Sequence, residues 1–151
     1  MKNKTGKKGS RLEAIRDAHG MEGTSSRTDR MEDYLEVIYE LMQEKGYVNA
    51  VDISEYLNVS SPSVTKMVKR LDESGHLNYE KYRGIVLTDQ GTTIAKDMHD
   101  RHNLLVEFLK MIGVSDNIAN RDAEGIEHHL HPETLKKLEE FVKTRKKEHK
   151  I

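Results

Sequence analysis

The stretch SPSVTKMVKRLDESGHLNYEKYRGIVL, from Ser61 to Leu87, decides the fold. Its first half repeats apolar residues at three- and four-residue spacing, which is typical of an amphipathic helix that ends near Ser74. Ser61 and Pro62 fit the N-cap and the first helical position of that helix. After Gly75 the apolar period changes from helical to alternating, and a turn at residues 82–84 separates two short runs, which predicts a β-hairpin.

Outward from this stretch, the remaining apolar patterns are helical. They predict helices over Met31–Glu44, Ala50–Leu57, Asp89–Ile112, Ser115–Leu130 and Pro132–Lys147. A helix, a short turn, a second helix and a hairpin together form a winged helix-turn-helix. The predicted fold is therefore mainly α. A disordered basic extension covers residues 1–30, the winged helix-turn-helix of three helices and a β-hairpin covers 31–88, and a helical region covers 89–151.

Polar and basic side chains on the predicted helix after the turn suit a DNA-reading role. A helix fits the major groove, where residues near its N-terminus reach base edges and phosphates. The candidate DNA contacts are Ser61, Ser63, Thr65, Lys66, Lys69 and Arg70 on the helix, and Lys81 and Arg83 at the hairpin tip. The helix over Ala50–Leu57 and the helix that follows it could also be two ordinary packed helices whose lysines face solvent. The hairpin directly after it favours the DNA reader.

The distribution of charge along the chain indicates that the protein binds divalent cations. The chain has 25 basic and 26 acidic residues, but both ends are basic and residues 31–134 hold 19 acidic against 10 basic side chains. Phosphate repels an acidic surface, whereas carboxylates collect divalent cations. Both properties are compatible if bound metal offsets the acidic charge before DNA binds.

Three predicted helices present oxygen and imidazole groups at spacings that place them on shared faces. The candidate metal ligands are Asp33 and Glu36, His102, and Glu124, Glu127 and His128. Taken singly, each group also has an ordinary structural explanation. Asp33 and Glu36 fit acids near a helix N-terminus, and His102 fits a buried histidine. The group from Glu124 to His128 fits a solvent-exposed helix face. Together they match the carboxylate and Glu-x-x-His pattern of di-metal sites in helical bundles.

The chemistry of these groups selects among metals. Four adjacent carboxylates repel one another, and two divalent cations neutralise them, which favours a binuclear site. Oxygen and imidazole without sulfur suit Mn²⁺ or Fe²⁺ better than Zn²⁺ or Cu⁺, although Zn²⁺ or Cd²⁺ can bind in vitro. The chain has no Cys, which excludes disulfides and thiolate sites.

Four stretches of the sequence resemble a known family. Met31-Glu-Asp-Tyr-Leu-Glu-Val-Ile-Tyr39, Ser63-Val-Thr-Lys-Met67, Tyr79-Glu-Lys-Tyr-Arg-Gly84 and Glu124-Gly-Ile-Glu-His-His129 are similar to the manganese-responsive members of the diphtheria toxin repressor family. The similarity extends from about Met31 to the C-terminus. Residues 1–30 lie outside it.

The resemblance implies a metal-dependent repressor that binds operator DNA as a homodimer, with residues 89–151 as its metal-binding and dimerisation region. It places the ligands of the manganese members on the same six residues. Iron-responsive members carry Met at the position of Asp33 and Cys at that of Glu124, so oxygen at both positions favours Mn²⁺. It also implies that the metal-loaded repressor shuts off manganese uptake genes. We expect two Mn²⁺ per chain and a palindromic operator.

Two further classes stay open from the sequence. One is a winged-helix regulator that responds to iron, to another metal or to a small organic ligand. The other is a di-metal enzyme, which would need an open coordination position and a substrate cleft but no helix-turn-helix.

No apolar run approaches the length of a membrane span and no secretory leader is visible. The expectation is a cytoplasmic protein that is not an enzyme and has neither a membrane partner nor an organic substrate.

Overall fold

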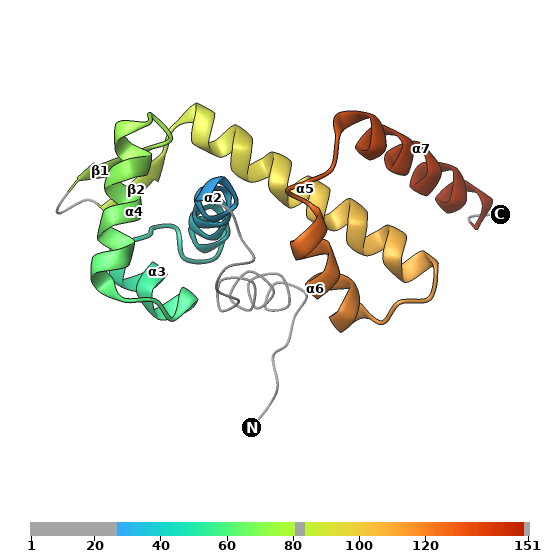
Figure 1. Cartoon of the computed structure of the whole chain (residues 1–151), viewed down its shortest axis with the longest axis horizontal. Helices are drawn as coiled ribbons and strands as arrows, with labels where there is room; N and C mark the ends of the chain where they lie inside the picture. Colours follow the sequence, from blue (N-terminus) through green and yellow to red (C-terminus); the bar gives the residue numbers. More distant parts are fainter. Residues whose placement is uncertain (1–26, 81–83, 150–151) are drawn as a thin grey trace, which may run out of the picture. The chain divides into compact units, whose positions relative to one another are not determined.

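The computed structural model describes residues 27–80 and 84–149, and these form two compact units that meet at Asp97 and Met98. The junction lies inside the long helix α5 (Asp89–Met111). The first unit holds α2 (Arg27–Lys45), α3 (Ala50–Leu57), α4 (Ser61–Glu73), β1 (Leu77–Glu80) and β2 (Gly84–Leu87), as Figure 1 shows. The second holds the end of α5 with α6 (Asp116–Ile126) and α7 (Pro132–Glu148). The mainly α fold with one hairpin is confirmed.

Helix α2 begins at Arg27, before the predicted start at Met31. Residues 27–30 therefore belong to a helix and not to the predicted disordered extension, whose first 26 residues lie outside the described part of the chain. The apolar periodicity that set the predicted start says nothing about a polar first turn. Asp29 in that turn is buried, and its charge complements the positive end of the helix dipole.

The turn between α3 and α4 is fixed by local polar contacts. Asn49 and Asp52 form a capping box at the start of α3, with hydrogen bonds of 2.9 and 3.1 Å. Asn58 ends α3 in the left-handed conformation, which Asn tolerates better than most residues. Ser60, not Ser61 as predicted, is the N-cap of α4, because its hydroxyl accepts the Ser63 N–H. Pro62 lies inside the first turn.

The core of the first unit joins α2, α3, α4 and the hairpin. Its buried members include Leu35, Ile38, Ile53, Val64, Val68, Leu71, Leu77 and Ile85. Strand β2 lies against the α2–α3 connection, where the Ile85 N–H donates to the Val48 carbonyl at 2.8 Å. Gly84 has φ +85°, and a Cβ there would lie 2.6 Å from that carbonyl oxygen. The hairpin is thus tied to the helix-turn-helix at a position that only glycine fits.

In the second unit, α7 packs on the end of α5. The rings of Phe108 and Phe141 meet edge to face with centroids 5.9 Å apart, and Val142 is buried. Ile112, the predicted last residue of the long helix, lies beyond the end of α5 and is 61% exposed. His131 occupies the N-cap position of α7, although its side chain makes no capping hydrogen bond.

Helix α6 is shorter than predicted. It ends at Ile126, with Glu127 as its C-cap. Among the residues that the structure describes, no helix is long and apolar enough to span a bilayer.

We predict opposite effects of alanine at two helical glycines. A Cβ at Gly91 would lie 1.9 Å from the His76 carbonyl oxygen, so Gly91→Ala should lower the free energy of unfolding by about 1–3 kcal/mol or more. Gly125 has open space around it, so Gly125→Ala should raise that free energy by about 0.5–1 kcal/mol. Urea unfolding in EDTA measures both. Equal stability of the two variants would contradict the close packing of α5 on the α4–β1 connection.

Candidate metal centre and nucleic-acid interface

Helix α4 presents its predicted DNA-contact residues on one exposed surface. Ser61, Ser63, Thr65, Lys66 and Lys69 are exposed, and Arg70 is half-buried. Val64, Val68 and Leu71 on the opposite face are buried in the core, which fixes the orientation of the helix. The hydroxyl of Ser63 lies 2.8 Å from that of Ser60, so it also takes part in the helix cap. The described helix therefore leaves its N-terminal and basic side chains accessible, as a major-groove reader requires.

The other two predicted DNA contacts, Lys81 and Arg83, lie outside the described residues. The strands before and after them, β1 and β2, pair in antiparallel register, with Leu77 opposite Leu87 and Glu80 opposite Gly84. The wing is therefore present as predicted, up to its tip.

Helix α2 carries an acidic face that is buried. Asp33 and Glu36 are both inside the protein, as are Asp29 and Glu40 on the same helix face. Sequence analysis missed the last two, although their four-residue spacing from Asp33 and Glu36 marks them. Burial also raises the pKa of the neighbouring Tyr34 phenol, an effect that the Arg30 charge opposes. The first unit thus holds two of the six predicted ligands one turn apart.

The second unit brings the other four predicted ligands together. One ligand atom from each of Glu124, Glu127 and His128 lies within 4.8 Å of the others. His128 Nε2 is 3.8 Å from a carboxylate oxygen of Glu124 and 3.8 Å from one of Glu127. The end of helix α6 produces this cluster. Glu124 lies in the last turn of the helix, and Glu127 follows it as the C-cap, still in a helical conformation, with His128 next in the chain.

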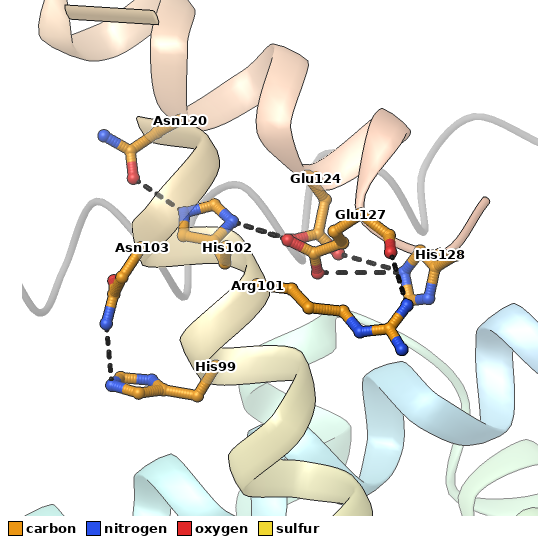
Figure 2. A network of polar contacts seen from close by, with 8 residues as sticks. All are labelled: His99, Arg101, His102, Asn103, Asn120, Glu124, Glu127 and His128. Atoms are coloured by element: carbon orange, nitrogen blue, oxygen red, sulfur yellow. Dashed lines mark hydrogen bonds and ion pairs between the residues drawn. The ribbon is translucent and has the colours of Figure 1, made fainter. Parts of the chain in front are cut away.

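His102 approaches the same carboxylates from α5. Its Nδ1 lies 2.8 Å from Glu127 Oε2 and 3.8 Å from Glu124 Oε2 (Figure 2). The side chains of His102, Glu124 and Glu127 are at most 1% exposed. His102 therefore points into the interior from α5.

Two neighbours of this cluster were missed by sequence analysis. Asn120 on α6 places its side-chain oxygen 2.9 Å from His102 Nε2. The Arg101 guanidinium donates to the Glu127 carbonyl at 3.4 Å. Asn120 lies one turn before Glu124, so its spacing would have placed it on the ligand face.

The donor set fits a hard divalent cation. Within the second unit the clustered groups are two carboxylates and two imidazoles, all nearly free of solvent, and the chain has no thiolate. Oxygen and imidazole ligands are those that Mn²⁺ and Fe²⁺ use. The arrangement can therefore concentrate negative charge and lone pairs at one buried place.

Comparison with known proteins gives matches to two domain families. Residues 27–85 match the family described as iron dependent repressor, N-terminal DNA binding domain. Residues 88–150 match the one described as iron dependent repressor, metal binding and dimerisation domain. The HTH-type transcriptional regulator MntR of Shouchella clausii strain KSM-K16 is 50% identical over 115 residues, which cover 76% of this chain and 80% of that protein.

Solved structures agree with this relationship. The manganese regulator SloR superposes with a TM-score of 0.66 at 30% identity, over 75% of this chain and 53% of that one. A crystal structure of ScaR with bound Zn²⁺ gives a TM-score of 0.65 at 30% identity, with the same coverage. The chain thus spans about half the length of these two solved proteins. On the two domain matches and the MntR identity, this chain belongs to the iron-dependent repressor family of metal-dependent transcription regulators.

Proposed function

We propose that this protein is a Mn²⁺-responsive repressor that binds operator DNA as a homodimer and shuts off manganese uptake genes. The buried cluster of Glu124, Glu127, His128 and His102 is the observation that carries the proposal, since it supplies hard ligands and no sulfur. That SloR is a manganese regulator supports the choice of metal. The protein acts where its DNA is, in the cytoplasm.

The proposed ligand set extends to both units. Asp33 and Glu36 from α2 join the four groups of the second unit, which gives six ligands for two Mn²⁺ per chain. All six residues have the types and spacings that such a site requires, which supports this set. When bound, two divalent cations supply the charge that balances the four carboxylates. Fe²⁺, Zn²⁺ or Cd²⁺ can occupy such a site in vitro.

The chain's own residues then couple the site to DNA. Asp33 and Glu36 belong to the helix that packs on the helix-turn-helix core, while Glu124, Glu127 and His128 belong to the dimerisation region. Shared ligation restricts how the two regions are oriented, and in a homodimer it fixes the spacing of the two α4 helices. Half-sites on successive turns of a palindromic operator lie about 34 Å apart. Coupling of this kind is typically about 1–3 kcal/mol.

The rival functions fit less well. A di-metal enzyme has no use for a winged helix-turn-helix, and the family to which the chain belongs consists of transcription regulators. A regulator of the same fold that answers to an organic ligand would bind DNA equally well without metal. Whether the protein responds to iron instead of manganese depends on its selectivity between Fe²⁺ and Mn²⁺. The binding experiments below measure this selectivity when they are repeated with Fe²⁺.

We expect His128→Ala to abolish metal-dependent operator binding while the fold is kept. Loss of this imidazole should weaken Mn²⁺ binding by about 10–100-fold or more, since changes in the outer shell alone have effects of that size. Calorimetry measures Mn²⁺ affinity, and fluorescence anisotropy measures operator affinity at fixed Mn²⁺. His129→Ala is the matched control, because His129 is the exposed next residue and is not among the proposed ligands. Wild-type operator affinity in His128→Ala would contradict the ligand assignment.

Lys66→Ala should weaken operator binding without changing Mn²⁺ affinity of the free protein. If Lys66 contacts one phosphate, the slope of log affinity against log salt should fall by about 1. Lys110→Ala removes the same charge from an exposed position outside the helix-turn-helix, and it should leave the slope unchanged. Equal slopes for both variants and the wild type would exclude Lys66 as a DNA contact.

The whole proposal is tested by capture of fragmented genomic DNA on the purified protein. With Mn²⁺ we expect a few discrete fragments, which include promoters of manganese uptake genes, and with EDTA we expect none. Equal retention under both conditions would favour the organic-ligand regulator. Absence of specific retention under both would favour the enzyme.

A further inference from the structure

Asn120 is a buried polar residue that the proposed ligand set does not use. It lies on α6, one turn before Glu124, and is 8% exposed. Its side-chain oxygen is 2.9 Å from His102 Nε2, on the side of the ring away from the carboxylates (Figure 2). The His102 ring is therefore held between an amide on one side and Glu127 on the other.

The orientation of the Asn120 amide is set by its second hydrogen bond. The amide nitrogen donates to the Asp116 carbonyl at 2.9 Å. A carbonyl oxygen only accepts, so the amide cannot be turned over without placing two oxygens against each other. The Asn120 oxygen must then face His102, and because that oxygen also only accepts, Nε2 of His102 must carry a proton.

The proton on Nε2 leaves Nδ1 of His102 as the nitrogen that faces the carboxylates. With Nε2–H bound to Asn120, Nδ1 is the nitrogen that lies 2.8 Å from Glu127 Oε2 and 3.8 Å from Glu124 Oε2. The 2.8 Å contact between Nδ1 and Oε2 needs a proton of its own in the metal-free protein, and a cation bound at Nδ1 would take the place of that proton. A half-turn of the ring would replace both nitrogens by carbons, so that neither Asn120 nor Glu127 would have a hydrogen-bond partner there. Asn120 thus opposes both the other tautomer and the other ring orientation.

We propose that Asn120 is a positioning residue that holds His102 with Nε2 protonated and Nδ1 as its metal-ligating nitrogen. The proposal rests on the proposed function, since it assigns one atom of that metal site. A ligating imidazole commonly donates its other N–H to an oxygen acceptor, which fixes its tautomer and orientation. Here the acceptor and two carboxylate ligands lie on one stretch of chain, from Asn120 to Glu127, so helix α6 sets their spacing from His102.

The test compares three substitutions in the full-length protein. Asn120→Leu keeps the approximate volume and removes the acceptor. Asn120→Asp keeps an oxygen facing His102. Asn117→Leu makes the same change at an exposed position of α6, and controls for its effect on the helix.

The first readout is the ¹⁵N spectrum of the histidine rings, in metal-free and in ¹¹³Cd²⁺-loaded protein. His102 signals are identified by their loss in His102→Gln. We expect a slowly exchanging Nε2–H signal from His102 in both states of the wild type, and coupling of ¹¹³Cd to Nδ1. That Nε2–H signal should disappear or exchange rapidly in Asn120→Leu, persist in Asn120→Asp, and be unchanged in Asn117→Leu.

The second readout is Mn²⁺ affinity by calorimetry. Asn120→Leu should weaken Mn²⁺ binding by about 10–100-fold, the usual effect of losing such a partner. Asn120→Asp should recover most of this loss, and Asn117→Leu should bind as the wild type does. A general weakening of the fold would not be rescued by the aspartate variant.

Several outcomes would overturn the proposal. Coupling of ¹¹³Cd to Nε2 of His102 in the wild type would overturn it. This measurement needs no variant, so it decides the matter even if Asn120→Leu fails to fold. A wild-type Nε2–H signal and wild-type Mn²⁺ affinity in Asn120→Leu would also do so. Failure of the wild type to bind Mn²⁺ or Cd²⁺ would instead refute the proposed function, while the metal-free spectra would still decide whether Asn120 holds the ring.

Discussion

The structure depends on the burial of carboxylates beside imidazoles. Glu124 and Glu127 are 2% and 0% exposed, and both lie within 3.8 Å of the ring nitrogens of His102 and His128. Removing ionised carboxylates from water costs several kcal/mol each unless positive charge compensates them. Divalent cations would supply such charge, and under the proposed function these carboxylates and imidazoles would be the ligands that hold them.

This constraint explains why an acidic chain can belong to a DNA-binding family. The central region is strongly acidic, yet the exposed face of α4 carries Lys66 and Lys69 among small hydroxyl residues. The acids proposed as ligands are buried, so their charge is not presented to phosphate at a contact surface. Under the proposed function, cation binding would reduce the remaining repulsion further, and it would act through the same residues that restrict the orientation of α4. Charge compensation and positioning would then be two effects of one binding event.

Much of the fold could be predicted from the sequence because its elements follow strong local rules. Helix α3 has the predicted bounds, and the change of period after Gly75 located the hairpin. The errors arose where local pattern carries little information. The polar first turn of α2 has no apolar signal, the choice between Ser60 and Ser61 as N-cap depends on one hydrogen bond, and the periodicity that included Ile112 does not show where a helix stops.

The candidate site was predictable to a similar degree. Residue type and spacing selected His102, Glu124, Glu127 and His128 as candidate ligands, because chemistry restricts metal ligands to few side chains, and the structure brings these four together. Asn120 was not identified, since its spacing places it on the face of Glu124 but does not reveal its tertiary contact with His102 from another helix or its local hydrogen bond to the Asp116 carbonyl. Candidate ligands can therefore be predicted from residue type and spacing, while the tertiary contacts between such residues and their neighbours are seen only in the structure.

The central claim is that Mn²⁺ and operator DNA bind to one coupled system. The most direct measurement is a Mn²⁺ binding isotherm of the wild-type protein with and without saturating operator. Linkage requires that the operator tighten Mn²⁺ binding by the same factor by which Mn²⁺ tightens operator binding, and we predict a factor of about 5–150 in both directions. Identical Mn²⁺ isotherms with and without operator would contradict the account.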